Sequence, residues 1–318
     1  LSSFGRRSLA DSVTYLSGNP ITRGLAQYGL GLLMVVQRAS GGNTTYFLGE
    51  VSITAWQKYF PIVYALKEPL AWWILVITVL LSLTLKLKKF DFHLRDAEKW
   101  VKNNFVAFAM LLWIAIYWIT SIKSNLNIGV RHLLPVYSFT IILISGQIAN
   151  LHENLKLKIQ NSGLKLKYLT FNFLFFILIF SYVFENLRVW PYYLTYFNQI
   201  AGGPSGGYRY VVDSNLDWGQ DLKRLSKWID RKKIETIHLD YFGWSDPAYY
   251  LGSKLTYLHA GQYKSAEDFL RQNPNGGYLA VSATFFMGSK ENIAASYAWL
   301  DNYKPITTIG NSIFVWKF

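Results

Sequence analysis

The sequence of 318 residues contains no cysteine. Disulfide bonds and thiolate metal sites are therefore excluded, and any exported part of the chain must fold without a covalent framework. A segment of about 130 residues can do so, because a domain of that size buries a core of its own. The lack of cysteine is thus compatible with an exported domain.

Acidic residues are few: 19 Asp and Glu stand against 32 Lys and Arg, which gives a net charge of +13. Such a charge can indicate a nucleic-acid partner, but its distribution argues against one here. Ten basic and four acidic residues lie in two short segments, 86–102 and 151–167. Residues 188–318 hold 14 basic and 11 acidic residues, interspersed, with no basic stripe between aromatic side chains. We expect no nucleic-acid partner.

The sequence also lacks several motifs that mark common soluble enzymes. No HExxH zinc motif, Walker phosphate-binding loop or dinucleotide-binding fingerprint is present. Zinc peptidases, P-loop enzymes and nicotinamide-dependent dehydrogenases are therefore not expected. Any chemistry must come from residues in less familiar patterns.

Four long apolar runs without a formal charge are the dominant feature of the chain. They are 17 to 19 residues long and cover residues 69–85, 105–122, 133–151 and 168–184. A helix of that length extends roughly 26 to 29 Å, which matches the ~30 Å hydrocarbon core of a bilayer. A soluble protein with four buried helices is the alternative, and the charged flanks of every run disfavour it. We expect about four transmembrane helices.

The connectors between the runs predict an orientation. Segments 86–102 and 151–167 hold six and four basic residues, whereas the connector 123–131 holds two. Short loops rich in Lys and Arg stay in the cytoplasm, so the first and third connectors are expected inside. By alternation, residues 1–68 and 188–318 are extracytoplasmic. The protein is expected in the cell membrane as a multi-pass protein with contacts to membrane lipids.

The expected fold class is an α-helical polytopic membrane bundle with a C-terminal extracytoplasmic α/β domain. Residues 1–68 form an extracytoplasmic segment whose apolar stretch, 29–36, is too short to span and predicts an interfacial helix. Residues 69–187 form the bundle. The glycine-rich run 201–207 predicts a loop leading away from the membrane, towards the small domain of residues 188–318.

Within that domain, spacing predicts one helix and four strands. Asp217 and Gln220 resemble a helix cap, and the helix would continue with an apolar stripe at Leu222, Leu225, Trp228 and Ile229. Strands are expected at residues 237–242 and 278–284. A hairpin is expected from 306–309 to 312–318, turning at Gly310 and Asn311.

Three candidate cations share one depth at the extracytoplasmic ends of two runs: Lys67, Arg131 and His132. Such a group suits an anionic lipid headgroup, because Arg offers two parallel hydrogen bonds to a phosphate and Lys a mobile charge. Ordinary snorkelling of Lys and Arg at a membrane interface is the alternative. Basic residues on this side run against the positive-inside bias and so need a reason.

A polar cassette, DSNLDWGQD at residues 213–221, is the second candidate. Asp213, Asp217 and Asp221 would share one face if the segment were helical throughout. The row could bind a divalent cation or present a general base, with Trp218 and Gln220 lining an acceptor or sugar site. Helix capping and a solvated helix surface are the competing interpretations. A divalent cation is thus a possible cofactor, but no residue is assigned as its ligand.

A third cluster precedes several aromatic residues. Asn43 and Glu50 flank an aromatic pair, and Trp56, Tyr59 and Phe60 follow. Amide and carboxylate groups among aromatic faces are typical of sugar sites, and they are also typical of membrane interfaces. Both interpretations stay open from the residues alone.

These segments together resemble a known family. The motifs that carry the resemblance are GGN at 41–43, YFLGE at 46–50, YFP at 59–61, LKEPL at 66–70, RHLLP at 131–135, YFN at 196–198, GGP at 202–204 and DSNLDWGQDL at 213–222. From about residue 40 the chain resembles bacterial members of the protein-mannosyltransferase-like family, which are phospholipid-carrier-dependent glycosyltransferases of the GT-C superfamily. The last motif is the most specific.

The resemblance implies transfer of a sugar from a polyprenyl-phosphate carrier to a protein, lipid or glycan acceptor on the outer face of the membrane. It places Lys67 and Arg131 near the carrier phosphate, with His132 beside them. The family's acidic catalytic motif lies in its first outer loop, and this chain has no equivalent. We therefore expect the catalytic carboxylate upstream of Leu1, and the chain to be an incomplete C-terminal part.

Two other functions are alternatives to sugar transfer. A non-catalytic, membrane-anchored protein that binds glycans or a partner would explain the same bundle and domain. A transporter is less expected, because the four runs contain no ionisable residue for a substrate or proton path.

Overall fold

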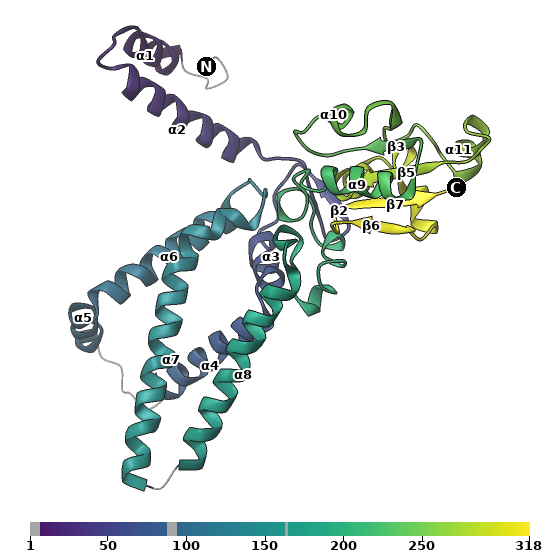
Figure 1. Cartoon of the computed structure of the whole chain (residues 1–318). Helices are drawn as coiled ribbons and strands as arrows, with labels where there is room; N and C mark the ends of the chain where they lie inside the picture. The colour runs from purple at the N-terminus through teal and green to yellow at the C-terminus, as the bar shows by residue number, and fades with distance from the viewer. Residues whose placement is uncertain (1–6, 88–93, 163–164) are drawn as a thin grey trace.

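A computed structural model describes residues 7–87, 94–162 and 165–318 of the chain. Long helices form one part of the molecule and a five-stranded sheet forms the other (Figure 1). Two basic residues of the first connector, Lys88 and Lys89, lie outside the described residues.

The chain begins with two packed helices, α1 (Arg7–Gly18) and α2 (Arg23–Gly41), which project away from the rest of the molecule (Figure 1). The apolar stretch 29–36 lies within α2, so a helix is confirmed there. A short hairpin follows, with strands β1 (Thr45–Phe47) and β2 (Glu50–Ser52). Leu48 and Gly49 form its turn at positive φ, which is the geometry that two-residue hairpin turns require.

Seven helical segments build the bundle: α3 (Tyr59–Lys67), α4 (Leu70–Leu87), α5 (Leu94–Asn103), α6 (Phe105–Lys123), the 3₁₀ turn η2 (Val130–Leu133), α7 (Leu134–Ser162) and α8 (Lys165–Val189). Each apolar run of the sequence is helical. The backbone of Glu68 is extended, because a residue before proline is biased away from the helical region, and Pro69 therefore separates α3 from α4.

Three helices in the described part of the chain are long and apolar enough to cross a membrane: Phe105–Lys123, Val130–Leu157 and Tyr168–Val189. Taken together as one span, α3 and α4 are also long and apolar enough, but the pair is bent by 112°. The bundle thus has three such helices, or four if the bent pair counts as one. The first apolar run lies within α4 from Leu70 on, and the bend falls at Pro69, where the run begins.

The start of α4, the end of α6, the start of α7 and the end of α8 gather beside the sheet (Figure 1). Helix α5, the end of α7 and the start of α8 lie away from the sheet (Figure 1). The orientation of the bundle in a membrane stays a prediction from the charge pattern.

The segment after α8, residues 190–318, is called the C-terminal domain below. Its strands are β3 (Ile237–Asp240), β4 (Leu255–Tyr257), β5 (Tyr278–Ser282), β6 (Thr307–Ile309) and β7 (Ile313–Lys317), in the order β4-β3-β5-β7-β6. β4, β3 and β5 run parallel, and β7 is antiparallel to both of its neighbours. Its helices are α9 (Leu222–Lys232), α10 (Pro247–Leu251), α11 (Ala266–Gln272) and α12 (Ala283–Gly288), with short 3₁₀ turns η3 to η10.

The predicted helix and strands are all present. Leu222, Leu225 and Ile229 are buried on one face of α9 against the sheet. Gly310 and Asn311 both have positive φ, 60° and 66°, as a type I′ hairpin turn requires. The edge strand β4 and the helices α10 to α12 were not predicted, because they are short and carry no clear period.

One hydrophobic core joins the bundle to the C-terminal domain. It runs without a break from the sheet to α3 and the start of α7, through Trp316, Phe286, Phe197, Tyr59 and Leu133. The end of the bundle beside the sheet is therefore packed into the domain.

The predicted loop at residues 201–207 does not lead away from the bundle. Ala201 is buried, and a Cβ at Gly207 would lie only 2.0 Å from the Phe197 ring. The predicted loop is therefore present and packs on the shared core, while its direction relative to a membrane stays a prediction. Glycine is used here because the backbone packs directly on an aromatic side chain of the shared core.

Candidate functional site where the bundle meets the C-terminal domain

The cassette of residues 213–221 lies at the junction of the two parts. It begins with the 3₁₀ turn η6 (Asp213–Asn215) and continues as a loop until α9 starts at Leu222. The three carboxylates therefore do not share a helical face, and that expectation is wrong. The predicted cap is also displaced, since Asp221 rather than Asp217 precedes the helix.

Asp217 instead closes a local turn. Its Oδ1 accepts a 3.1 Å hydrogen bond from the Gly219 amide, and the Thr284 hydroxyl donates to Oδ2 at 3.4 Å. Gln220 accepts from the Trp218 amide at 2.7 Å, which stiffens the same turn. Asp217 is fully buried, and this burial raises its pKa to about 7.

Asp221 has different partners and no access to solvent. Its carboxylate accepts from the guanidinium of Arg224 and from the Ser312 hydroxyl, the latter at 2.7 Å. The turn glycine Gly310 packs directly against this carboxylate. Asp221 therefore fixes the β6–β7 turn to the start of α9, which is a structural role.

Asn215 connects the cassette to the bundle. Its side-chain amide donates to the Tyr59 hydroxyl at 2.7 Å, and its Oδ1 accepts from the Val130 amide at 2.9 Å. Tyr59 is the first residue of α3 and Val130 opens η2. One buried side chain thereby sets the position of both bundle segments relative to the cassette.

Arg131 follows directly and is held on the cassette. Its guanidinium carbon lies 4.7 Å from the centre of the Trp218 ring, which favours a cation–π contact. The residue is exposed, and within the described residues it forms no ion pair. Burial raises the pKa of nearby Asp213, although the Arg131 charge acts in the opposite direction. The positive charge of Arg131 is thus available to an anion.

A cavity of about 260 Å³ lies beside this group. Polar and aromatic side chains from distant parts of the chain line it, among them Asn43, Tyr59, Asp213, Phe242 and Thr284. The Thr284 hydroxyl also accepts from the Asp213 amide at 3.0 Å, which holds this strained residue (φ 54°) in place. Amide, carboxyl and hydroxyl groups on aromatic walls are typical of a site for a polar organic ligand.

The structure separates Asn43 from Glu50. Asn43 lines the cavity together with Asp213, so two predicted residues are brought together. Glu50 begins β2 and is exposed, paired in register with Phe47. Among the residues that line the cavity, Glu50 is absent.

Lys67 lies elsewhere in the same junction. Its Nζ donates to the Leu194 carbonyl at 2.7 Å and stands 4.2 Å from the centre of the Phe197 ring. Lys67 is the last residue of α3, and Tyr59 is the first. Arg131 lies within electrostatic range of Tyr59, at the other end of this helix. Eight residues of helix correspond to about 12 Å. As placed here, Lys67 and Arg131 therefore do not converge on one phosphate.

His132 faces a third region. It lines a groove of about 790 Å³ between α2 and α6, together with Val36, Phe60, Tyr117 and Lys123. Its Nε2 is buried, and no hydrogen-bond partner for that atom is found within the described residues. Apolar side chains from α2, α3 and α6 line the groove together with Lys123, which suits a lipid chain with an anionic end.

Arg38 near the end of α2 lies within electrostatic range of both His132 and Asp213. Sequence reasoning missed this residue, because nothing in the chain pattern connects α2 to η2. Arg38 and Arg131 thus form the cationic pair that the structure assembles, with Lys67 outside it. Burial and these two guanidinium charges lower the pKa of His132, which favours its neutral form.

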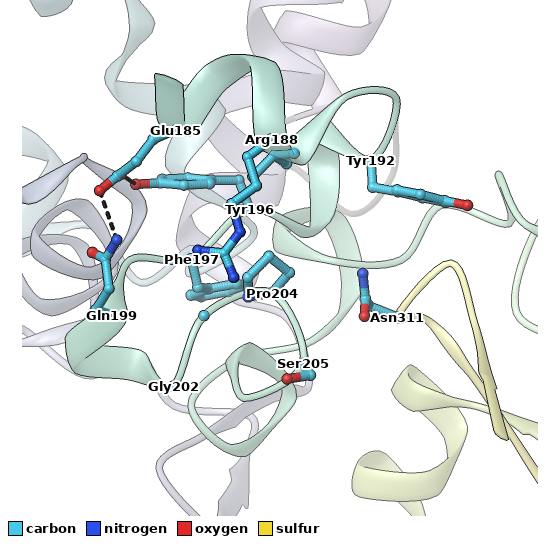
Figure 2. Close-up of a pocket in the computed structure, with 12 residues that line it drawn as sticks. Glu185, Arg188, Tyr192, Tyr196, Phe197, Gln199, Gly202, Pro204, Ser205 and Asn311 are labelled. Carbon is cyan, nitrogen blue, oxygen red and sulfur yellow. Dashed lines mark hydrogen bonds between the residues drawn. The ribbon is translucent and has the colours of Figure 1, made fainter. Parts of the chain in front are cut away.

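A second cavity, of about 460 Å³, opens at the end of α8 (Figure 2). Glu185 and Arg188 project into it from α8, and Tyr196, Gln199 and Pro204 form the facing wall. Neither charged residue was predicted as functional. The only feature of the sequence that marks Glu185 and Arg188 is their position within one helical turn after the fourth apolar run.

The facing wall includes residues 203–207, GPSGG, which fit the spacing of the nucleophile motif GxSxG. That motif works on a strand-to-helix turn with a histidine nearby. Here the run connects the two 3₁₀ turns η4 (Gln199–Ala201) and η5 (Gly207–Arg209), and no histidine lines the cavity. Ser205 is therefore not placed as a hydrolase nucleophile.

In the described part of the chain, no three His, Asp or Glu side chains are grouped to hold a metal ion. The separate partners of Asp213, Asp217 and Asp221 explain this, since each carboxylate is engaged in its own turn. No family model, curated protein or solved structure matches this chain.

Proposed function

We propose that this chain is the C-terminal part of an integral-membrane glycosyltransferase that moves a sugar from a polyprenyl-phosphate carrier to an acceptor. The observation that carries the proposal is Arg131, an exposed cation without an ion pair in the described residues, held on Trp218 at the start of an apolar helix. A free cation at that place suits a lipid-linked phosphate.

Separate regions around Arg131 suit the different parts of such a substrate. The groove between α2 and α6 suits the isoprenoid chain, since apolar side chains line much of it and His132, the neighbour of Arg131, lies in its wall. The cavity lined by Asn43, Asp213 and Thr284 offers hydrogen-bonding groups to the sugar. The phosphate would lie between them, against the Arg131 guanidinium.

In the proposed reaction, the bond between the anomeric carbon and the phosphate oxygen breaks, and its electron pair stays on the phosphate. A bond forms between that carbon and the acceptor atom, whose proton passes to a carboxylate. Arg131 stabilises the charge that develops on the departing phosphate. The family resemblance implies that a carboxylate accepts this proton, and no residue of this chain is assigned to that role.

The test uses the full-length gene product in membranes, supplied with polyprenyl-phosphate sugars that carry a radiolabel. We expect label to move to an acceptor, and Arg131→Ala to reduce the rate tenfold or more. Arg231→Ala, an exposed cation on α9, is the matched control and should act like wild type. Carrier binding without transfer would favour the alternative of a non-catalytic binding protein, and full turnover in Arg131→Ala would refute the role of that residue.

A further inference from the structure

The cavity at the end of α8 lies apart from the Arg131 site and holds a fixed negative charge. The Tyr196 hydroxyl donates to Glu185 Oε2 at 2.5 Å, and the Gln199 amide donates to Oε1 at 2.6 Å (Figure 2). Burial and the Glu185 carboxylate both raise the pKa of Tyr196, so its hydroxyl stays protonated and donates. The carboxylate is therefore oriented before any ligand arrives.

The same cavity holds a positive charge that is not neutralised. Arg188 lies one turn beyond Glu185 on α8, and its guanidinium extends towards Phe197 and Pro204 (Figure 2). Neither residue has an ion-pair partner within the described residues, and they do not pair with each other. Two separated charges of opposite sign in one cavity suit a ligand that carries both signs.

The position of the cavity indicates where that ligand comes from. It opens at the end of the apolar helix Tyr168–Val189. Trp190, Tyr193 and Ile200 are the chain neighbours of the lining residues Val189, Tyr192 and Gln199, and they are 69%, 53% and 69% exposed. Exposed aromatic residues at the end of a spanning helix are typical of the headgroup layer of a bilayer. A ligand at this depth is a lipid headgroup rather than a solute.

We propose that this cavity binds the headgroup of a zwitterionic phospholipid with a primary amine, such as phosphatidylethanolamine. The phosphate would accept hydrogen bonds from the Arg188 guanidinium, and the ammonium would donate to the Glu185 carboxylate. The acyl chains would pass over Trp190 and Ile200 into the bilayer. This inference requires the chain to lie in a membrane, but it does not rest on sugar transfer.

The experiment measures lipid retention by native mass spectrometry on the full chain, released from nanodiscs that contain equal amounts of three lipids. These are phosphatidylethanolamine, phosphatidylcholine and phosphatidylglycerol with identical acyl chains. We expect wild type to retain phosphatidylethanolamine at least fivefold over the other two. Phosphatidylcholine has no N–H donor for Glu185, and phosphatidylglycerol has no ammonium group.

Two variants separate the charges. Arg188→Ala should reduce retention of all three lipids about tenfold, because the phosphate loses its partner. Glu185→Gln should keep the lipid but lose the preference for phosphatidylethanolamine over phosphatidylglycerol. Arg231→Ala, outside the cavity, should match wild type.

Three outcomes would overturn the proposal. The first is unchanged retention in Arg188→Ala, and the second is an unchanged preference in Glu185→Gln while the protein remains folded. The third is displacement of the lipid by an equal concentration of soluble glycerophosphoethanolamine, which would point to a free solute instead. Because the readout is lipid binding, none of these results depends on whether the chain transfers sugar.

Discussion

The side-chain amide of Asn215 donates to the hydroxyl of Tyr59 across a 2.7 Å hydrogen bond, although the two residues are 156 positions apart in the sequence. Both side chains are buried. Since Asn215 also accepts from the Val130 amide, it holds η2 and therefore Arg131 beside Trp218. The proposed phosphate site depends on this contact between the bundle and the C-terminal domain.

Asn215→Ala should destabilise the protein and weaken carrier binding together. The variant leaves the Tyr59 hydroxyl and the Val130 amide without their partner, and each buried group left unpaired costs about 1–3 kcal/mol. The thermal unfolding midpoint in detergent measures the first effect. Asn292→Ala, at an exposed position, is the control. Equal midpoints for the two variants would show that Asn215 does not hold the junction.

Asp217→Asn should change how stability depends on pH. The folded pKa of about 7 lies above the ordinary value of 3.8, so the folded state binds more protons than the unfolded state between these values. This contribution to stability is fully present below about pH 4 and is lost as the pH rises through 7. Each pKa unit corresponds to about 1.4 kcal/mol.

The side-chain amide of the Asp217→Asn variant does not ionise, so the loss of stability at high pH disappears. Its carbonyl oxygen still accepts from the Gly219 backbone amide. Asp217→Asn should therefore melt at a higher temperature than wild type at pH 8, and the difference should shrink to near zero at about pH 4. Thermal melts of both proteins across this pH range provide the measurement. A constant difference between the two proteins at every pH would be inconsistent with a buried, titrating Asp217.

Gly310→Ala should destabilise the C-terminal domain more than Gly202→Ala does. Both glycines have positive φ, 60° and 80°, and a left-handed backbone costs alanine roughly 1–2 kcal/mol. A Cβ at Gly310 would lie 2.0 Å from the Asp221 carboxylate, whereas the nearest atom to one at Gly202 would be 3.5 Å away. Limited proteolysis of the two variants compares them, and equal resistance would argue against the close packing of Gly310 on Asp221.

Much of the fold could be predicted from the sequence, because the signals are local. The apolar runs, the stripe of α9 and the Gly310-Asn311 turn each depend on residues within one element. Helix α3 was not predicted, although the first apolar run was expected to begin at Pro69, where the break between α3 and α4 falls. The bend follows from the backbone restriction that proline places on Glu68.

The candidate site could be predicted only in part, because its contacts are long-range. The sequence suggests a helix cap at Asp217, because nothing near it in the chain indicates that the fold brings Thr284 to its carboxylate. Lys67 and Arg131 have similar positions relative to their apolar runs, yet α3 separates them. Glu185 and Arg188 resemble ordinary charges at a membrane boundary until Tyr196 and Gln199 are seen to fold back on them.

The most direct measurement of the central claim is the affinity of the full chain, in phosphatidylcholine nanodiscs, for polyprenyl monophosphate. The account predicts saturable binding that weakens tenfold or more in Arg131→Ala. Arg131→Lys should bind with intermediate affinity, because lysine keeps the charge but not the paired hydrogen bonds, and Arg231→Ala should bind like wild type. Equal affinity of wild type and Arg131→Ala for the lipid phosphate would contradict the account.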